Sequence, residues 1–459
     1  MRAWSPANAY PIPWRADVPR RLAWELLRSS SLTPLRDLDA AAEHVGLDAR
    51  DRGFARRLVG TEVRRRGTLR ALVRHFARGK PSRETALHLH LGLVQAFFMD
   101  RVPDHAIVSE TVRTVHDSMG PSKVRYVNGV LRSALRARLP GSSGDPCRDL
   151  VGRDWHLEEP IFRDPVEHPY LWAEDALSVP APLMKRFAKR FGEEEARALA
   201  RVALAEPPLS VRVVTGDRAE TMAQLEAAGL HPRPGTHAGV FLMPAAEAPE
   251  LSLSEAFAAG RVTIQGESAL RAAEAVQASE GERVLDLCAA PGGKTAVLAA
   301  AGASVTACDV SSGKLERLGE TVQRLGVAER VELCLASELD QGDFDAVLVD
   351  APCTNTGVLA QRPEARWRYG PKTKRDLLAV QAQLLARGAE LVRPGGRLVW
   401  STCALESDEN ARAVKTFMAE HPGWSLEEEA EALPGFDTDQ EGGAGPIDGG
   451  YFARLRLKG

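Results

Sequence analysis

Two cysteines with chemically active surroundings stand out in this sequence, because each closely follows a predicted buried strand. Asp350 and Cys353 come after the apolar run 344–349, and Cys403 comes after the apolar run 397–400. A thiolate is a strong nucleophile, and a nearby carboxyl group can bind or protonate a substrate. Free cysteines are also common as small core residues. The two strand-end positions and the nearby acid favour a catalytic pair.

The stretch 286–295 (Asp-Leu-Cys-Ala-Ala-Pro-Gly-Gly-Lys-Thr) joins a predicted strand at 283–285 to a predicted helix that continues from Ala296. Gly292 and Gly293 would let the backbone approach a ligand closely, and a helix start offers free N–H groups to negative charge. A plain strand-to-helix connection would look similar. The surrounding pattern favours a ligand.

A nucleoside cofactor is indicated by the next predicted strand, 305–308, which ends in Asp309. An acid in this position can accept hydrogen bonds from both hydroxyl groups of a ribose. The dinucleotide fingerprint G-x-G-x-x-G and the phosphate loop G-x-x-x-x-G-K-[ST] are both absent from the sequence. A nicotinamide-dependent oxidoreductase is therefore disfavoured.

Alternating strands and helices continue to the end of this region and predict an open, doubly wound α/β sheet. The ligands of such sheets bind at the carboxyl ends of the strands. We therefore expect the glycine turn, Asp309, Asp350 with Cys353, and Cys403 to converge. The predicted strands are 283–285, 305–308, 331–334, 344–349 and 397–400, and the predicted helices include 314–325 and 377–391.

Length and composition suggest a multidomain protein of ordinary globular character, since 459 residues are many for one core. No apolar segment reaches membrane-spanning length and no export signal is apparent, so we expect a cytoplasmic protein. The six cysteines include no C-x-x-C pair, which argues against a zinc site, and disulfides are not expected. We expect a monomer without a metal.

The net charge of −3 conceals a basic N-terminal region. Residues 20–140 contain 23 Lys and Arg against 12 Asp and Glu, whereas the remainder contains 36 against 50. Apolar residues recur every three or four positions in this region, which predicts helices that each bury one face. A basic helical region indicates a polyanionic partner such as RNA, although a solvated basic face would have the same composition.

These patterns divide the chain into five segments. We predict a proline-rich tail at 1–19, a helical domain at 20–140, a linker rich in glycine, serine and proline at 141–165, a small α+β subdomain at 166–260, and the catalytic domain at 261–459.

The cofactor stretch 286–295 and the two cysteine motifs, Asp-Ala-Pro-Cys and Ser-Thr-Cys, resemble those of the Sun (RsmB) family of RNA cytosine-5 methyltransferases. The helical segment resembles the NusB-like RNA-binding domain of bacterial members, on the basis of Asp-Arg at 51–52, Val-Pro-Asp-His at 102–105 and Asn-Gly-Val-Leu-Arg at 128–132. The resemblance implies an all-α NusB-like domain, a small α+β subdomain that helps to hold RNA, and a Rossmann-like class I methyltransferase domain.

The family's cofactor is S-adenosylmethionine, which would lie over the glycine turn. Gln265 and Ser268 belong to a segment that lies near the cofactor in the family. The family usually has an acidic residue for the adenine amino group after the third strand; here Ser337 stands there, and Glu338 could replace it. The implied cofactor-binding residues are Cys288, Ala289, Ala290, Pro291, Gly292, Gly293, Lys294, Asp309, Ser337 and Asp350.

The resemblance also implies a covalent mechanism, because carbon 5 of cytosine becomes nucleophilic only after a thiolate has added to carbon 6. The family's nucleophile corresponds to Cys403, and Cys353 would release the product. Asp350 would hydrogen-bond the cytosine edge around N3 and N4, with Lys294 supporting Asp350 or the base. DNA cytosine-5 methyltransferases use the Pro-Cys thiol, so reversed roles stay open. Trp367 could stack on RNA or pack internally.

The domain order resembles that of the bacterial enzyme that modifies small-subunit (16S) ribosomal RNA, which is therefore the expected substrate. Transfer RNA is the near alternative. An RNA-binding ribosome assembly factor without catalytic activity is a third hypothesis, against which the intact Asp350, Cys353 and Cys403 argue.

Overall fold

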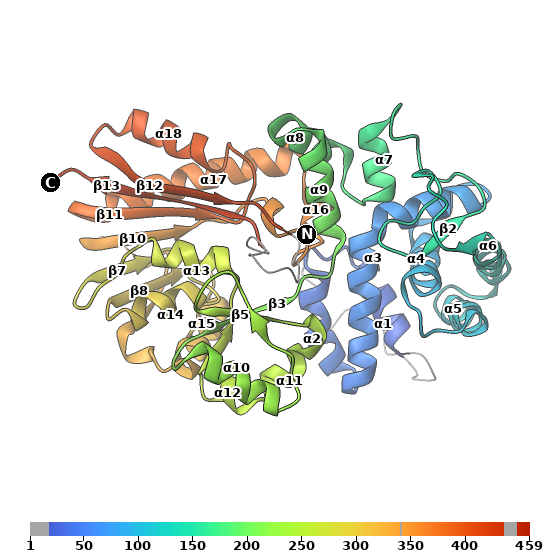
Figure 1. The fold of residues 1–459 in the computed structure, drawn as a ribbon, viewed down its shortest axis with the longest axis horizontal. Coiled ribbons are helices and arrows are strands. Elements are labelled where there is room, and N and C mark those ends of the chain that lie inside the picture. Colours follow the sequence, from blue (N-terminus) through green and yellow to red (C-terminus); the bar gives the residue numbers. More distant parts are fainter. Residues whose placement is uncertain (1–17, 340–341, 436–447) are drawn as a thin grey trace. The chain divides into compact units, whose positions relative to one another are not determined.

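The computed structural model describes residues 18–339, 342–435 and 448–459. The chain separates into two compact units, which are coloured along the sequence in Figure 1. Unit 1 comprises the chain up to Leu204 together with Arg366–Arg368, and unit 2 comprises Ala205–Ala365 and Tyr369–Gly459. Most of the predicted tail, residues 1–17, lies outside the described residues.

Unit 1 is helical, as the spacing of its apolar residues predicts. Its longest helix, α3, begins after Asp48, whose side chain accepts a hydrogen bond from Asp51 N, and α4 begins after Ser82, which caps Thr85 N in the same way. Helix α4 is buried on nearly every side, so it forms the centre of the unit. The first six helices are α1 (Val18–Arg28), α2 (Pro34–His44), α3 (Ala49–Phe76), α4 (Arg83–Phe98), α5 (Asp104–Met119) and α6 (Val124–Arg136).

Several arginines of α3 have partners inside unit 1. Arg66 pairs with the fully buried Glu62 at 2.7 Å, and Arg65 donates to the carbonyl oxygen of Val151 at 2.8 Å. Arg74 pairs with Asp175 at 2.8 Å. The basic composition of this helix therefore serves internal packing as well as the surface.

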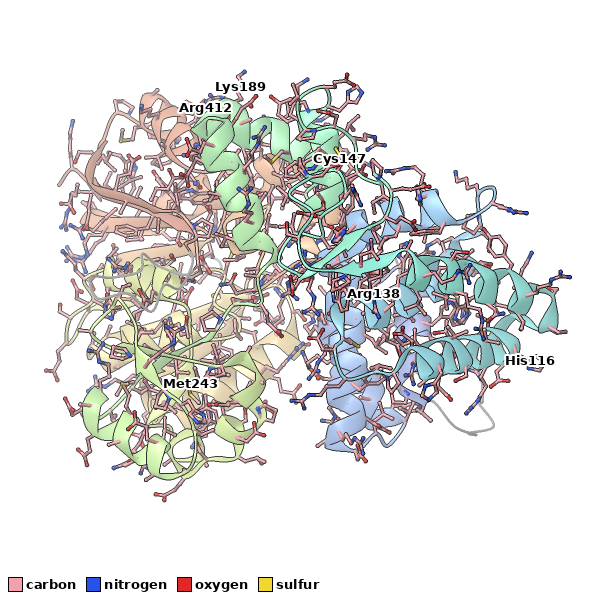
Figure 2. All side chains as sticks on the ribbon, turned by 45° about the vertical axis from the view of Figure 1, so that its right-hand side comes forward. His116, Arg138, Cys147, Lys189, Met243 and Arg412 are labelled. Carbon is pink, nitrogen blue, oxygen red and sulfur yellow. The ribbon has the colours of Figure 1, made fainter. Side chains whose placement is uncertain are left out.

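The predicted linker 141–165 is a packed part of unit 1. Its strand β2 (Trp155–Leu157) pairs with β1 (Arg138–Pro140), which directly precedes the segment, and the guanidinium of Arg138 lies 4.4 Å from the ring centre of Trp155. Arg138 and Cys147, which lies between the two strands in sequence, are labelled in Figure 2. Buried Ile161 and Phe162 anchor the segment further. Glycines and prolines here form turns of an ordered hairpin rather than a flexible connection.

Three further helices of unit 1, α7 (Pro169–Ala176), α8 (Ala181–Phe191) and α9 (Glu193–Leu204), lie in the range that the sequence assigned to the α+β subdomain. Hydrogen bonds explain the difference, since Thr68 N in α3 donates to Ser178 Oγ at 3.1 Å. Sequence periodicity does not show against which domain such helices pack.

Unit 2 begins with a small α+β layer, as predicted. Its antiparallel sheet has the order β4-β5-β3-β6 and packs on three helices through a core that includes Val211, Phe241 and Leu251. The strands are β3 (Leu209–Val213), β4 (Arg233–Pro234), β5 (Val240–Met243) and β6 (Val262–Ile264), and the helices are α10 (Arg218–Ala227), α11 (Ala248–Leu253) and α12 (Glu255–Ala258).

The larger sheet of unit 2 has seven strands in the order β12-β13-β11-β10-β7-β8-β9. Strands β11, β10, β7, β8 and β9 are parallel, and β13 and β12 are added antiparallel at one edge. The strands are β7 (Arg283–Asp286), β8 (Ser304–Asp309), β9 (Val331–Leu335), β10 (Phe344–Asp350), β11 (Val392–Thr402), β12 (Trp424–Ala432) and β13 (Gly450–Leu457). All five strands predicted for this sheet are present.

Helices cover both faces of the larger sheet and make the expected Rossmann-like sandwich (Figure 1). The core of one face includes Leu385 and Phe417 from α17 and α18, and that of the other includes Val276 and Leu298, beside α13 and from α14. The helices are α13 (Glu267–Glu274), α14 (Gly293–Ala300), α15 (Ser312–Arg324), α17 (Pro371–Glu390) and α18 (Ala411–Glu420); the short α16 (Ala365–Arg368) ends in the segment that belongs to unit 1.

The crossing of α3 and α7 requires a glycine. A Cβ atom on Gly67 would lie 1.9 Å from the carbonyl oxygen of Glu174, so Gly67→Ala should force two backbones apart and destabilise the protein by about 1–3 kcal/mol. Gly53 lies in the same helix with nothing within 4 Å of its Cβ position, so Gly53→Ala should stabilise by roughly 0.5–1 kcal/mol. Chemical unfolding of the two variants tests this; equal effects would contradict the proposed close approach.

Candidate functional site

The parallel strands of unit 2 bring the predicted site residues to one edge of the sheet. Strand β7 ends at Asp286, β8 at Asp309, β10 at Asp350, and β11 just before Cys403. The chain passes from β7 outward through β8 to β9 and returns on the other side of β7 with β10, so the strand order changes direction between β7 and β10. This crevice is where open α/β sheets bind their ligands.

The turn after β7 needs the glycine that the sequence places there. Gly292 has φ +103°, which side-chain-bearing residues rarely adopt, and a Cβ atom there would lie 3.0 Å from Leu318 Cγ. Ala289 N donates to the carbonyl oxygen of Cys308 at 2.9 Å, which fixes the turn against β8. Because α14 starts at Gly293, its first N–H groups lie directly after this turn.

Buried polar atoms without partners surround the turn. Asp286 is fully buried; Thr295 Oγ1 donates to its Oδ2 at 2.8 Å, whereas its Oδ1 has no partner. Both amide atoms of buried Gln265 also lack partners, and its side chain lies 3.5 Å from a Cβ position built on Gly293. Unpaired buried polar groups are costly, so a polar ligand at this turn would satisfy them. The site therefore fits the amino-acid and nucleoside groups of S-adenosylmethionine.

The other predicted cofactor residues follow the next two strands, β8 and β9. Asp309 is buried, and its Oδ1 contacts Lys314 Nζ at 2.9 Å, at the position expected for ribose recognition. Ser337 and Glu338 are exposed in the turn after β9, and Glu338 accepts a weak hydrogen bond from Leu335 N at 3.4 Å. Burial raises the pKa of Cys288 to about 12, so this residue contributes a neutral thiol.

The two motif cysteines lie together. Cys353 Sγ and Cys403 Sγ are 3.0 Å apart, with Cys353 buried and Cys403 partly exposed. Asn355 contacts both cysteines, since its amide nitrogen donates to the carbonyl oxygen of Cys353 at 2.7 Å and its Oδ1 lies 3.4 Å from Cys403 Sγ. The hydrogen bond with Cys403 and burial raise the pKa of Cys353 well above its ordinary value.

Asp350 and Lys294 form an ion pair beside the thiols. Lys294 Nζ is 2.6 Å from Asp350 Oδ2, and Ser401 Oγ donates to Asp350 Oδ1 at 3.1 Å. Burial lowers the pKa of Lys294, but the Asp350 carboxylate outweighs burial, and the negative charges of Asp286 and Cys403 add to it, so that the pKa is raised. The lysine is therefore a cation that is paired with the Asp350 carboxylate and lies within electrostatic reach of Cys403.

The remaining cysteines lie elsewhere. Cys308 and Cys334 face each other on β8 and β9, and Cys147 lies in unit 1 (Figure 2). Within the described ranges no group of three or more His, Cys, Asp or Glu residues could hold a metal ion, and no helix is long and apolar enough to cross a membrane.

Sequence reasoning missed several polar residues that hold the two cysteine loops. Glu409, Gln381 and Asn355 all contact these loops, but none belongs to a motif with a recognisable spacing. Asp286 stands at the start of the predicted cofactor stretch, yet only the structure shows that its carboxyl group is buried.

Trp367 packs inside unit 1. Its Nε1 donates to the carbonyl oxygen of Val63 at 2.7 Å, and the guanidinium of Arg70 lies 5.1 Å from a ring centre. Of the two interpretations left open by the sequence, these contacts favour the packed aromatic.

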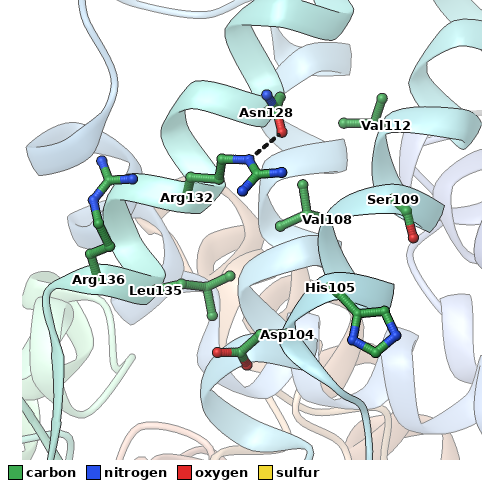
Figure 3. Close-up of a pocket in the computed structure, with 9 residues that line it drawn as sticks. All are labelled: Asp104, His105, Val108, Ser109, Val112, Asn128, Arg132, Leu135 and Arg136. Atoms are coloured by element: carbon green, nitrogen blue, oxygen red, sulfur yellow. Dashed lines mark hydrogen bonds between the residues drawn. The ribbon is translucent and has the colours of Figure 1, made fainter.

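A groove of about 510 Å³ lies between α5 and α6 in unit 1 (Figure 3). Arg132, which donates to Asn128 Oδ1 at 3.0 Å, and Arg136 line one side of it. The full lining is Asp104, His105, Val108, Ser109, Val112, Asn128, Arg132, Leu135 and Arg136.

A glycine turn and an acidic strand end, side by side at the switch of a doubly wound sheet, are typical of a Rossmann-like domain that binds a nucleoside cofactor. The sequence comparisons agree. A family model described as 16S rRNA methyltransferase RsmB/F matches residues 273–443, and a NusB family model matches residues 19–136. The chain belongs to the RsmB family. It is an RNA methyltransferase whose methyl donor is S-adenosylmethionine.

Two relatives support this assignment along most of the chain. The probable ribosomal RNA small subunit methyltransferase B of Bacillus subtilis (strain 168) is 32% identical over 348 residues, which cover 73% of this chain and 72% of the relative. The ribosomal RNA small subunit methyltransferase B of Pseudomonas putida (strain KT2440) is 31% identical over 459 residues, which cover 96% and 98% of the two chains.

Solved structures share the fold. The crystal structure of PH0851 superposes with a TM-score of 0.72 at 22% identity and covers 96% of this chain and 99% of that one. The structure of NSun6 from Pyrococcus horikoshii with SFG gives a TM-score of 0.51 at 22% identity and covers 61% of this chain and 98% of that one.

The burial of Asp286 predicts a specific pH dependence of stability. Burial raises its pKa from 3.8 to about 7, so the folded state keeps a proton that the unfolded state releases, and this residue's contribution to stability falls as pH rises from about 4 to 7. Asp286→Asn imitates the protonated form. We expect the free energy of unfolding of the variant, measured on the full chain without cofactor, to increase relative to that of the wild type as pH rises, by up to about 4 kcal/mol.

Asp345 provides a control of opposite sign. Burial raises the pKa of Asp345, but hydrogen bonds from Arg283 N and from the Arg393 side chain outweigh burial and lower it. Asp345→Asn should therefore lose stability relative to the wild type above pH 4. Parallel pH profiles of the two variants would contradict the assignment for Asp286.

Proposed function

We propose that this protein methylates carbon 5 of a cytosine in small-subunit (16S) ribosomal RNA through a covalent cysteine intermediate. The observation that carries the proposal is the pair of thiols 3.0 Å apart at the ends of β10 and β11. The ion pair of Lys294 and Asp350 lies next to them and offers groups for the polar edge of a base.

Cys403 is the better nucleophile of the two. It is the more exposed thiol, and its negative charge is among those that raise the pKa of Lys294. Cys353 is buried, and its raised pKa keeps it as a thiol that can donate a hydrogen bond to the Cys403 sulfur. In the proposed mechanism Cys403 is therefore the attacking sulfur, and Cys353 donates a hydrogen bond to it.

Attack of the Cys403 thiolate forms a bond between sulfur and carbon 6 and moves an electron pair into the ring toward N3. Asp350 accepts a hydrogen bond from the N4 amino group, and the adjacent Lys294 cation stabilises the charge that develops at the N3 edge. Carbon 5 then has the electron density needed to take the methyl group that S-adenosylmethionine supplies when bound.

Release requires two further bond changes. The proton on carbon 5 passes to water, its electron pair restores the ring double bond, and the bond between carbon 6 and Cys403 breaks. Cys353 donates a hydrogen bond to the departing sulfur, which leaves as a thiolate. Because carbon 6 is inaccessible inside a stacked helix, the target base must be unpaired or flipped out.

The cofactor would lie over residues 288–294, with Asp309 on the ribose and Ser337 or Glu338 near the adenine. The free N–H groups at the start of α14 and the unpaired atoms of Gln265 and Asp286 support this position.

The names of the relatives favour small-subunit ribosomal RNA as the substrate. Transfer RNA modified by the same chemistry is the alternative. Bisulfite sequencing of ribosomal and transfer RNA from a strain without the gene tests the substrate. A lost 5-methylcytosine in 16S ribosomal RNA supports the proposal, whereas a loss confined to transfer RNA supports the alternative. Unchanged methylation of both would favour an assembly role.

Single substitutions separate the two cysteine roles. Cys403→Ala should lower methyl transfer by about 10³-fold or more and form no adduct, because the attacking sulfur is gone. Cys353→Ala should instead accumulate a covalent protein–RNA adduct that survives a denaturing gel, because release of the Cys403 sulfur loses its hydrogen-bond donor. Incubation of each variant with RNA and cofactor measures both effects.

The reverse pattern, with an adduct in Cys403→Ala alone, would exchange the roles. Cys147→Ala in unit 1 is the matched control, since its thiol lies outside the catalytic pair and it should behave as the wild type.

The arginines of the groove in unit 1 are suited to bind RNA phosphates. Replacing Arg132 and Arg136 together by Glu should weaken RNA binding and reduce its salt dependence by a slope of about 1–2. The control replaces the exposed Arg52 and Arg57 on α3 by Glu, which changes the net charge by the same amount. An equal loss of RNA affinity in both double variants would indicate a general effect of charge and would contradict a specific role of the groove.

A further inference from the structure

Glu409 is a fully buried carboxylate on the loop that follows β11. Thr354 N donates to its Oε2 at 2.9 Å and Thr354 Oγ1 donates to its Oε1 at 2.5 Å. Gln381 Nε2, from α17, donates to Oε2 at 2.9 Å. A buried charge with several donors is firmly placed, and removing its acceptor atoms leaves those donors unpaired.

These hydrogen bonds connect the loops of the two cysteines. Thr354 is the residue next to Cys353, and Gln381 also donates to the carbonyl oxygen of Pro352 at 2.9 Å, so the bonded atoms lie on both sides of Cys353. At the other end, the carbonyl oxygen of Glu409 accepts a hydrogen bond from Trp400 Nε1 on β11 at 2.9 Å.

The charge of Glu409 also acts on Cys353. Hydrogen bonding to Cys403 and burial are the main causes of the raised pKa of Cys353, the negative charges of Cys403 and Glu409 add to it, and a hydrogen bond from Asn355 N opposes it. The pKa of Glu409 itself is raised, mainly by burial and also by the negative charge of Glu406, and the donors from Thr354 and Gln381 offset only part of this rise.

Neighbouring charges do not replace that of Glu409. Glu406 lies nearby and its negative charge acts on Glu409, but Lys374 pairs with Glu406 at 2.8 Å and with Asp408 at 2.5 Å. The donors to the Glu409 carboxylate, from Thr354 and Gln381, are neutral groups.

We propose that Glu409 is a positioning residue that holds Cys353 beside the Cys403 sulfur and keeps Cys353 in its neutral thiol form. Glu409 thereby gives the two thiols different roles. Cys403 attacks as the thiolate, and Cys353 donates the hydrogen bond that assists release. The inference about release rests on the proposed function, whereas the effect of Glu409 on Cys353 does not.

The first test measures Cys353 alone in the full-length protein. In a Cys403→Ser background, the rate at which methyl methanethiosulfonate labels Cys353 is followed by mass spectrometry from pH 6 to pH 11. Glu409→Gln removes the charge, so the labelling midpoint should shift to lower pH by about one unit. Glu409→Asp keeps the charge and should label with nearly the original midpoint.

Glu267→Gln is the matched control. Glu267 is likewise buried in unit 2 and accepts hydrogen bonds from the backbone N–H and the hydroxyl group of one threonine, Thr236. Its loss should cost comparable stability without moving the labelling midpoint of Cys353. An unchanged midpoint in Glu409→Gln, or an equal shift in Glu267→Gln, would overturn the proposal.

The second test uses both cysteines with RNA and S-adenosylmethionine. Glu409→Gln should show a kcat about tenfold lower with a similar KM for the cofactor, and the protein–RNA adduct should persist longer, increasingly so toward pH 9. A structural defect alone would lower the active fraction without accumulating adduct. A shifted labelling profile without any adduct would uphold the effect on Cys353 and overturn instead the release step of the proposed function.

Discussion

The parallel pairing of β10 with β11 is the constraint on which the site depends. In this register Asp350 lies opposite Ser401, so the two chains leave the sheet side by side and their cysteines follow within a few residues. The backbone hydrogen bonds that set the register are buried between two apolar helix layers, where a shift would leave many polar groups unpaired. The proximity of the thiols is therefore a property of the sheet, which two flexible loops could not maintain by themselves.

Polar groups inside the domain refine what the sheet provides. The carboxyl groups of Asp286 and Glu409 are both excluded from water, yet their surroundings differ: one has a single threonine donor, and the other has donors from a backbone N–H, a hydroxyl group and an amide. Burial raises the pKa of both groups, and the additional donors around Glu409 oppose that rise. The first lies at the cofactor turn and the second behind the thiols, so each provides a different electrostatic environment on one sheet edge.

Much of this arrangement could be predicted from the sequence, and the limits have physical causes. Short apolar runs that end in Asp or Cys locate β7, β8, β10 and β11, because buried parallel strands require such runs and ligands gather at their ends. The composition of 141–165 predicts a linker where the structure has a packed segment with β2, since glycine and proline mark turns whether or not the flanking residues are packed. Glu409 gave no signal, because a carboxylate that bonds across loops far apart in sequence has no periodicity or motif. The grouping of α7–α9 with unit 1 likewise depends on tertiary hydrogen bonds such as that of Thr68.

The contribution of Arg366–Arg368 to unit 1 has a consequence for dividing the gene. Arg366 is completely buried there, and its guanidinium donates to the carbonyl oxygens of Ala203 and Ser178 at 2.6 and 3.4 Å. A fragment that stops at residue 204 would lack this arginine, and its interior would keep a hole lined by unpaired carbonyl groups. Separate expression of the helical half thus calls for a short peptide carrying these three residues, supplied in trans or fused through a linker.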